Sequence, residues 1–413
     1  MRTGGMRKLV SLVRRSPTGV VREHSTKPSG RCVSSVAVGS VKSAASRMWR
    51  LYVPVGVALS AALVTQWRYL HQHGYADDKP ELLSDVMVTC YCCLPLRITS
   101  RIGGWLTSIN LPVGLRPAIY GFFAETFGVE VDEVESDLST FPSLVEFFVR
   151  ALKSNARPIA PNTNMTSPAD GEVLYFGPVN SSCVEQVKGV TYDLRYFLGD
   201  PSDLPINQTV KSTGQKDDYV NALLKNPDNR LYQLIIYLAP GDYHRFHSPT
   251  DWNITFRRHF RGKLLSVNPK LLKYMPNLFS LNERVVYIGD WAAGFMAYAA
   301  IGATNVGSIR VYRDEELATN KARWADAAYW RDVSFDSMRM AKGELFGEFR
   351  LGSTIVLLFE APRDFQFCLQ VGQSIKVGQA LSVCSDHKAE RRQKHLIVNI
   401  AHNWKDIGKL DEH

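Results

Sequence analysis

The 413-residue sequence lacks the short motifs by which many metal and hydrolase sites are recognised. It contains no HExxH, the helical zinc motif, and no GxSxG, the sharp turn that exposes a nucleophilic serine in many hydrolases. Its seven cysteines are odd in number, and they do not supply the two separate CxxC pairs of a zinc site. We therefore predict neither a metal site nor a disulfide framework.

The net positive charge of the chain is confined to its N-terminal part. The formal net charge is +9, but residues 1–76 hold 12 lysines and arginines and a single acid, Glu23, so the remaining residues sum to −2. A protein that binds nucleic acid carries its basic surface on the folded domain. We therefore expect no nucleic-acid partner and interpret the basic segment as a targeting signal.

Acidic residues are almost absent from residues 1–47, which are rich in arginine, lysine and serine. This composition is typical of a mitochondrial presequence, because a secretory signal would carry its apolar core much nearer the N-terminus. The whole chain is 45% hydrophobic, which is enough for at least one sizeable buried core.

An uncharged run of 17 residues, LYVPVGVALSAALVTQW, extends from Leu51 to Trp67 between Arg50 and Arg68. Its length is the lower limit for crossing a bilayer, and tryptophan and arginine are typical of the two interfaces. We predict a single transmembrane anchor at residues 48–70; the alternative is a buried helix of a soluble domain. Because the positive charges precede it, the catalytic domain is expected to face the intermembrane space from the mitochondrial inner membrane.

Residues 81–157 are predicted to be helical. Ser139 or Thr140 can cap a helix whose apolar residues fall on one face, with Arg150 on the opposite, polar face. The stretch 87–115 is more apolar and is interrupted by glycine and proline. Helices of this kind either cover a core or lie in a membrane interface, and the sequence leaves both open.

From about residue 164 the pattern changes to short apolar runs separated by glycine, proline, asparagine and aspartate. The runs that predict strands are GEVLYFGPV, LYQLIIYLAP, ERVVYIG, GFMAYAAIG, GSIRVY and STIVLLFEAP. Residues 320–342 are polar and irregular and are expected to form a loop, whereas two Gly-Gln pairs flank a short strand within 371–381.

The predicted fold class is therefore α+β. A β-rich catalytic domain of short strands with barrel-like elements is expected at residues 158–385. It is preceded by membrane-associated helices and one N-terminal transmembrane helix, and a charged tail follows at residues 386–413.

Two histidines three residues apart, His244 and His247, follow an apolar run. Such a pair can be structural, can bind a metal, or can act as acid and base, and the spacing alone does not decide. Asp170 lies in a tight turn that enters another run, where an aspartate before glycine is most often only a turn former.

A serine directly after a glycine, Ser353 after Gly352, stands at the entrance of the run STIVLLFEAP. With Asp170 and His247 it completes an aspartate, a histidine and a serine, the residue types of a catalytic triad. Because GxSxG is absent, a serine in this position is better suited to attack the preceding backbone carbonyl than to serve as a conventional nucleophile.

These residues resemble the phosphatidylserine decarboxylases, in particular the mitochondrial form of animals. The resemblance covers roughly residues 84–381 and rests on spaced matches in the right order: EQVKGVTY at 185–192, GDYHRFHSP at 241–249, NERV at 282–285, GATNVGSI at 302–309 and LGST at 351–354. The tail after Leu381 extends beyond the family's pattern, so the resemblance assigns it no function.

The resemblance implies a precursor that cuts itself between Gly352 and Ser353. Asp170 would orient His247, which would take the Ser353 hydroxyl proton so that the oxygen attacks the Gly352 carbonyl. Elimination and hydrolysis would then convert Ser353 into a pyruvoyl group. A β chain ending at Gly352 and an α chain starting at Ser353 would stay together as a heterodimer.

The resemblance also implies a substrate and a reaction. The pyruvoyl group would form a Schiff base with phosphatidylserine in the membrane, and decarboxylation would yield phosphatidylethanolamine without any metal. His244 is the candidate acid for the decarboxylation step. Which of His244 and His247 serves self-cleavage and which serves decarboxylation is left open by the sequence.

Two other functions are compatible with parts of the sequence. A membrane-anchored Ser-His-Asp hydrolase would use the same side chains but would remain one chain. A lipid-binding scaffold without activity would have no need for the complete set of Asp170, His247, Gly352 and Ser353, so the sequence argues against it.

Overall fold

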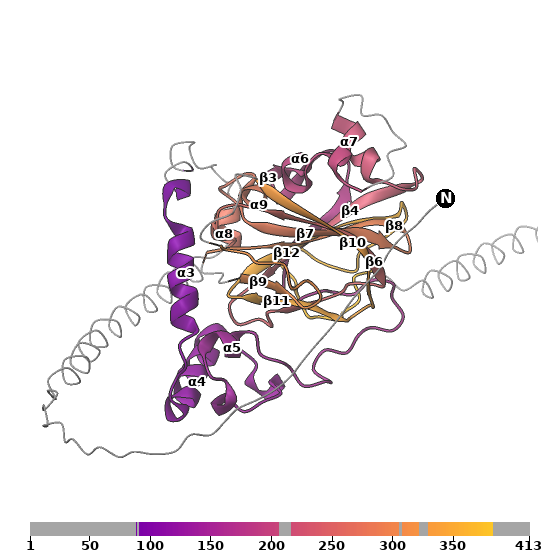
Figure 1. Cartoon of the computed structure of the whole chain (residues 1–413). Helices are drawn as coiled ribbons and strands as arrows, with labels where there is room; N and C mark the ends of the chain where they lie inside the picture. The colour runs from indigo at the N-terminus through magenta and orange to yellow at the C-terminus, as the bar shows by residue number, and fades with distance from the viewer. Residues whose placement is uncertain (1–87, 89–90, 206–215, 305–307, 322–328, 383–413) are drawn as a thin grey trace, which may run out of the picture. The chain divides into compact units, whose positions relative to one another are not determined.

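An antiparallel β-sheet of eight strands forms the centre of the fold (Figure 1). The computed structural model describes residues 88, 91–205, 216–304, 308–321 and 329–382. Neighbouring strands follow the order β10-β6-β7-β8-β12-β4-β1-β13, and each adjacent pair is antiparallel. The strands are β1 (Gly171–Val179), β4 (Asn229–Leu238), β6 (Trp252–Phe260), β7 (Arg284–Trp291), β8 (Gly294–Ile301), β10 (Trp330–Met340), β12 (Ser353–Pro362) and β13 (Ser374–Ile375).

Two smaller sheets accompany the large one. The first has the order β5-β11-β9, and the second is the hairpin of β2 and β3. Their bounds are β5 (Arg245–His247), β11 (Leu345–Arg350), β9 (Ser308–Val311), β2 (Cys183–Val187) and β3 (Val190–Asp193). The prediction of an α+β fold with a β-rich core is confirmed, and the six predicted runs correspond to β1, β4, β7, β8, β9 and β12.

Strand β12 is buried on both of its faces. Val356 and Leu358 belong to one apolar cluster, whereas Ile355, Leu357 and Phe359 belong to another. Since successive side chains of a strand point to opposite faces, the two clusters lie on opposite sides of the sheet. A strand covered on both sides needs apolar residues throughout, which explains the unbroken run in the sequence.

Short helices cover one face of the large sheet. Their side chains, among them Phe197, Leu223, Leu272 and Phe279, join the cluster of Val356. The helices are α6 (Leu194–Leu198), α7 (Lys216–Leu223), α8 (Pro269–Leu272), α9 (Leu278–Leu281) and the 3₁₀ helix η4 (Pro201–Asp203). The small β5-β11-β9 sheet covers the other face, where Phe246, Ile309 and Phe349 pack against Ile355 and Leu357.

The N-terminal part of the described chain is helical. Its elements are α3 (Leu96–Thr107), η1 (Val113–Leu115), α4 (Arg116–Phe127), η2 (Val131–Glu133), η3 (Leu138–Thr140) and α5 (Leu144–Phe148). A small core holds α4 to α5, with the rings of Tyr120 and Phe147 stacked 4.9 Å apart. The predicted helix cap is wrong: Ser139 and Thr140 lie in η3, which Asp137 caps.

The described helices are too short or too polar to cross a membrane. The predicted presequence at residues 1–47, the predicted anchor at 48–70 and the predicted tail at 386–413 lie outside the described residues.

The loop expected at residues 320–342 is wrong over Trp330–Met340, which form β10. This strand lies at an edge of the large sheet and pairs only with β6 in the strand order. Most of its side chains are exposed or half-buried. An edge strand with so little burial needs no apolar run, so its sequence gave no strand signal.

A buried carboxylate, that of Glu360, fixes the C-terminal end of β12. It accepts hydrogen bonds from the backbone N–H groups of Lys225, Asn226 and Phe295, at 2.8 to 2.9 Å. The side-chain amide of Asn229 donates a further bond of 2.9 Å. Four donors therefore stabilise one charge that water does not reach.

Replacing Glu360 with glutamine should lower the free energy of unfolding by about 3 kcal/mol, because an amide group would then face N–H donors and leave some of them unpaired. Urea unfolding in a Ser353→Ala background, where the chain stays intact, measures this change. Glu316→Gln, the same substitution at an exposed position, is the control. Equal effects of the two substitutions would contradict the role assigned to Glu360.

Candidate active site

Ser353 is the first residue of β12 and is fully buried. Its backbone is paired with Leu238, the last residue of β4. Among the described residues its hydroxyl oxygen has no hydrogen-bond partner, and the same holds for the neighbouring Thr354 hydroxyl. Because buried polar atoms are normally paired, an unpaired serine at a strand entrance is a candidate for chemistry rather than for stability.

The turn before Ser353 has an unusual backbone. Leu351 and Gly352 have φ angles of 86° and 52°, so two consecutive residues occupy the left-handed region. Glycine adopts it freely, but leucine there costs on the order of 1–3 kcal/mol. This turn carries the chain from β11 in the small sheet to β12 in the large one. The predicted cleavage bond therefore lies one residue after a strained leucine, in the connection between two sheets.

His244 is fully buried in the segment that follows β4. Its Nδ1 lies 2.9 Å from the carbonyl oxygen of Asp242, so Nδ1 carries the proton and Nε2 keeps a lone pair. No described group contacts Nε2 by a hydrogen bond. Burial, aided by the nearby positive charge of Arg150, lowers the pKa of His244 to about 3, and the ring is therefore neutral at physiological pH.

The segments that carry His244 and Ser353 run side by side. Leu238 pairs with Ser353 at one point, and the Phe349 N–H donates a 2.9 Å bond to the carbonyl of His244 at another. Between these two contacts lie the strained turn and the loop that holds His244. The structure thus brings the two buried, unpaired groups into one region of the fold.

His247 lies in β5, and both of its ring nitrogens have partners. Nδ1 donates to the Gly343 carbonyl at 2.9 Å, and Nε2 lies 3.2 Å from the Tyr243 hydroxyl. Its backbone N–H donates a 2.7 Å bond to the carbonyl of Pro168, which ties it to the turn of Asp170. Burial lowers the pKa of His247, and the negative charge of Asp170 acts in the opposite direction.

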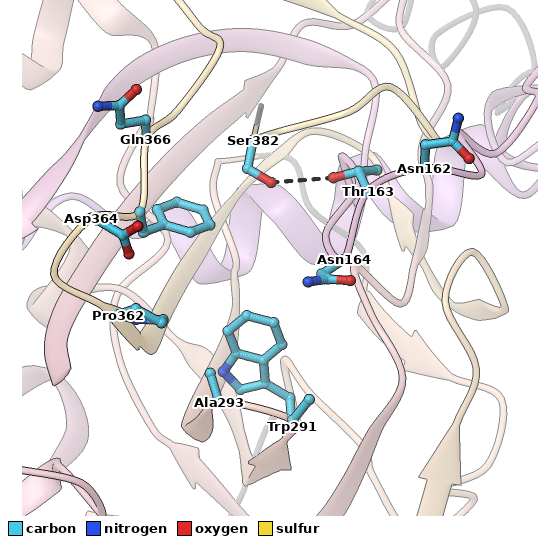
Figure 2. A pocket seen from close by; sticks show the side chains of 11 residues that line it. Asn162, Thr163, Asn164, Trp291, Ala293, Pro362, Asp364, Gln366 and Ser382 are labelled. Atoms are coloured by element: carbon cyan, nitrogen blue, oxygen red, sulfur yellow. Dashed lines mark hydrogen bonds between the residues drawn. The ribbon is translucent and has the colours of Figure 1, made fainter. Parts of the chain in front are cut away.

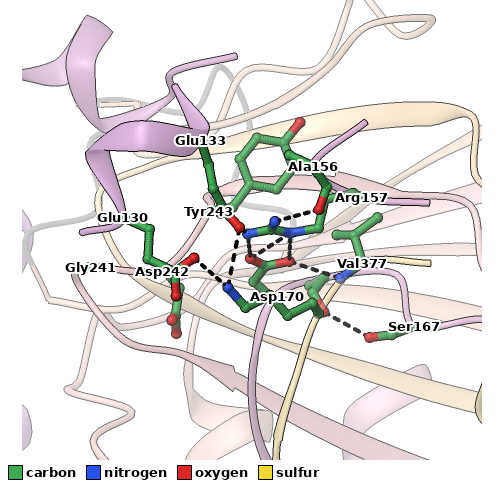
Figure 3. A network of polar contacts seen from close by, with 12 residues as sticks. Glu130, Glu133, Ala156, Arg157, Ser167, Asp170, Gly241, Asp242, Tyr243 and Val377 are labelled. Atoms are coloured by element: carbon green, nitrogen blue, oxygen red, sulfur yellow. Dashed lines mark hydrogen bonds and ion pairs between the residues drawn. The ribbon is translucent and has the colours of Figure 1, made fainter. Parts of the chain in front are cut away.

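Asp170 is buried, but its carboxylate is bonded to Arg157 and to the backbone N–H of Val377 (Figure 3). Within the described part of the chain it makes no hydrogen bond to either histidine. Asp170 and His247 are therefore linked in two ways. The His247 N–H bonds the turn that carries Asp170, and the negative charge of Asp170 acts on the His247 ring. Among the described residues the ring of His247 bonds neither Asp170 nor Ser353, so the roles predicted for these three residues stay predictions.

Two arginines support this site although the sequence did not mark them as candidates. Arg150 was expected on a polar helix face, but it is buried and donates to the carbonyls of Gly241 and Asp242. It thereby supports the loop that carries His244. Arg157 holds Asp170. Neither arginine lies in a recognisable motif, so only the three-dimensional pairing could have revealed them.

A cavity of about 310 Å³ opens near the other end of β12, beside Pro362 (Figure 2). Trp291, Asn164 and Asp364 line it together with other residues, and none of the predicted site residues does. It is therefore separate from the candidate site at Ser353. The described residues also contain no group of three or more metal-ligating side chains.

Comparison of the sequence with known proteins matches the part of the chain that holds the candidate site to one enzyme family. Residues 144–382, which include all of the candidate site residues, match the family model of phosphatidylserine decarboxylase. The chain belongs to the phosphatidylserine decarboxylase family. The mitochondrial phosphatidylserine decarboxylase proenzyme of Cricetulus griseus is 48% identical to it over 309 residues, which cover 73% of this chain and 75% of the relative.

More distant members of the family match a similar share of the chain. The mitochondrial phosphatidylserine decarboxylase proenzyme of Caenorhabditis elegans is 42% identical over 305 residues, covering 74% of this chain and 75% of the relative. The mitochondrial phosphatidylserine decarboxylase proenzyme 1 of Saccharomyces cerevisiae is 36% identical over 366 residues, covering 71% and 73%.

The neutral state of His244 should make folding depend on pH. In the folded chain its pKa is about 3, against an ordinary value of 6.5. Between these values the unfolded chain binds more protons, so stability should rise with pH by up to about 1.4 kcal/mol per unit. Asparagine at position 244 should remove this slope. Urea unfolding at pH 4, 5 and 6 of Ser353→Ala proteins with and without His244→Asn measures it.

Asp242 contributes to the pH dependence of stability with the opposite sign to His244. Burial raises the pKa of its carboxyl to about 6, so the folded chain binds the additional proton and this contribution falls as pH rises toward 6. Because Asp242 is present in both proteins, the difference between their curves isolates His244. Parallel curves would contradict the neutral, buried state assigned to this histidine.

Proposed function

We propose that this chain is a self-processing decarboxylase that converts phosphatidylserine into phosphatidylethanolamine and carbon dioxide. The observation that carries the proposal is the Gly352-Ser353 bond: a buried, unpaired serine hydroxyl directly after a strained turn, within the matched region of a proenzyme family. A Ser-His-Asp hydrolase would need its serine hydroxyl paired with a base and open to substrate, and Ser353 is neither.

Self-cleavage uses the side chain of Ser353 itself. As the Ser353 oxygen attacks the Gly352 carbonyl and gives up its proton, the peptide C–N bond breaks and an ester takes its place. Loss of the Ser353 α-proton then expels the Gly352 carboxylate and leaves a dehydroalanine. Water converts this residue into a pyruvoyl group and ammonia. No described atom lies within 4 Å of the position where a Cβ on Gly352 would stand. This open space suits such a rearrangement.

The surroundings of Ser353 fit a pyruvoyl group. The serine oxygen, which leaves with the Gly352 carboxylate, has no hydrogen bond to give up before it attacks, and the described residues hold no metal-ligand cluster at this position. Such a group supplies a carbonyl that combines with the amine of the substrate and accepts the electrons left when carbon dioxide departs. The β chain, to Gly352, and the α chain, from Ser353, would stay together as a heterodimer.

The charges around the two histidines support different roles for them. Self-cleavage needs a base that becomes positively charged, and Asp170 favours that state at His247. Arg150 disfavours it at His244. We therefore assign the Ser353 proton to His247, whose Nε2 must exchange the Tyr243 hydroxyl for that of Ser353. His244 remains neutral in the segment that runs alongside the Ser353 turn, and we assign to it substrate binding and the return of a proton.

The two roles predict different phenotypes. His247→Ala should leave the chain uncut, whereas His244→Ala should be cut and should then lack decarboxylase activity, with a loss of about 100-fold or more. Denaturing gels and intact mass spectrometry follow the α chain of about 61 residues, Ser353 to His413, with a pyruvoyl-blocked N-terminus.

Ser353→Ala is the control for the cleavage assay and should yield no short chain. An uncut His244→Ala protein would transfer the base role to His244. A full-length wild-type chain with decarboxylase activity would end the proposal of a pyruvoyl group.

An apolar surface on α3 and α4 supports a lipid substrate. Ile98, Ile102 and Trp105 follow one another at spacings of four and three residues on α3, and all are exposed. Ile119 and Phe122 are exposed on α4. We propose that this surface lies in the membrane interface, so that a diacyl lipid keeps its tails in the bilayer while its serine head enters the site. The N-terminal anchor of residues 48–70 and a position in the mitochondrial inner membrane, with the catalytic domain facing the intermembrane space, complete this proposal.

Glutamate at both Ile102 and Trp105 should reduce activity on phosphatidylserine vesicles by about 10-fold or more, because the charges oppose insertion into the interface. Activity on a soluble short-chain phosphatidylserine should change less than about 2-fold. Thr99→Glu, which adds one such charge at an exposed polar position of α3, is the control and should leave the activity on vesicles nearly unchanged. Equal losses on both substrates would contradict the interfacial role.

A further inference from the structure

Asp170 belongs to a cluster of five charged side chains, four of which are labelled in Figure 3. They are Glu130, Glu133, Arg157, Asp170 and Lys376, here called the Asp170 cluster. Three are negative and two are positive. The cluster includes the aspartate of the proposed triad, so what holds it together bears on self-cleavage.

Arg157 is the centre of this cluster. Its Nε donates to both carboxylate oxygens of Asp170, at 2.9 and 3.0 Å, and its Nη2 donates to one of them at 2.6 Å. The same Nη2 donates to Glu133 at 2.7 Å, and Nη1 donates to the carbonyl of Ala156 at 2.7 Å. One guanidinium thus uses each of its nitrogens and binds two carboxylates at once.

This geometry fixes the plane of the Asp170 carboxylate. A two-point contact between a guanidinium and a carboxylate allows one relative orientation, which a lysine ammonium does not impose. Asp170 is 4% exposed, so its carboxylate depends on donors of the protein rather than on water. Arg157 supplies most of these donors.

Glu133 in turn holds Arg157. Its pKa is lowered to about 2, chiefly by the hydrogen bond from Arg157, so it is ionised at physiological pH. Lys376 lies 3.6 Å from the other oxygen of Glu133 and 2.8 Å from Glu130. The segment at η2 therefore supplies a second anchor to the arginine that holds Asp170.

The donors to Asp170 come from both sides of the proposed cut. Arg157 precedes Gly352, whereas Val377 follows Ser353, and the Val377 N–H donates a 2.8 Å bond to Asp170. This bond lies beside the pairing of β13 with β1, in which Gly171 opposes Ile375. The part of the chain that would become the α chain thus helps to orient Asp170.

We propose that Arg157, anchored by Glu133, is a positioning residue for self-cleavage: it holds the Asp170 carboxylate in the orientation in which its charge acts on His247. The proposal rests on the proposed function, because it takes Asp170 and His247 as the groups that activate Ser353. Arg157 itself touches no reacting atom.

Several other titratable or charged groups also face Asp170. Arg150, Asp242, Tyr243 and His247 each interact with its charge. Only Arg157 among the described residues bonds the carboxylate through a side chain. Removing this guanidinium therefore leaves Asp170 with the Val377 N–H and with more distant charges.

The test follows self-cleavage of newly translated chains on gels between pH 5.5 and 8.5. Arg157→Gln should slow cleavage at pH 7 by about 30-fold and move the rise of the rate upward by about one pH unit, because a carboxylate without its cation takes up a proton more readily. Arg157→Lys keeps the positive charge but loses the two-point contact with the carboxylate. The cleavage rate should therefore fall about 5-fold, and its pH dependence should stay as in the wild type.

Glu133→Gln should slow cleavage about 3-fold, because Arg157 loses its second anchor. Glu135→Gln, the same change at an exposed position two residues away, should cleave like the wild type. Thermal unfolding of each variant in a Ser353→Ala background reports the stability of the fold. A loss of rate with an unchanged pH profile in Arg157→Gln would mean a merely structural role and would overturn the proposal.

Failure of the proposed function gives a different result. If the wild-type chain is not cut, or if Asp170→Asn is cut like the wild type, the triad itself is wrong and the proposal falls with it. If Asp170→Asn blocks cleavage while Arg157→Gln cleaves at the wild-type rate and pH, only the role of Arg157 is overturned.

Discussion

The pairing of β12 between β4 and β8 is the constraint on which the rest of the structure depends. All ten residues of β12 pair with β4, and six of them pair with β8. Its side chains fill the apolar clusters on both faces of the sheet. A cut before Ser353 would therefore make Gly352, in the turn, a C-terminus and Ser353 an N-terminus. Strand β12 would keep its place in the sheet. Self-cleavage at this point is compatible with a stable product because the new N-terminus begins a central strand rather than an edge.

The two histidines are both buried, but different charges act on their rings. Each ring donates its Nδ1 proton to a backbone carbonyl, of Asp242 for His244 and of Gly343 for His247, so each keeps a lone pair on Nε2. The tautomers are alike, and the surroundings differ. A positive charge, Arg150, acts on one ring, and a negative charge, Asp170, acts on the other. The same residue type three positions apart is thereby given two different tendencies to accept a proton.

The sequence predicted the parts of the fold that depend on local pattern. Strands with apolar or alternating runs bounded by turn residues carry a local signal, and β1, β4, β7, β8, β9 and β12 were found from it. Strand β10 was missed because an edge strand can be polar, and Arg150 was misplaced because helical periodicity alone assigned it to the polar face. The candidate residues Asp170, His244, His247 and Ser353 were visible as residue types in order. Their partners Arg157 and Glu133 were not, because ion pairs between distant segments leave no local signal.

The two ends of β12 show how a stable fold can tolerate an unstable site. At the C-terminal end four donors satisfy the buried carboxylate of Glu360. At the N-terminal end the hydroxyls of Ser353 and Thr354 have no described partner, and Leu351 is strained. Each unpaired buried group costs about 1–3 kcal/mol, so the entrance of the strand is unfavourable while its far end is firmly held. A bond in such a place is the one whose loss the fold can most readily accept, since cutting it relieves strain and removes little of the packing that keeps β12 in the sheet.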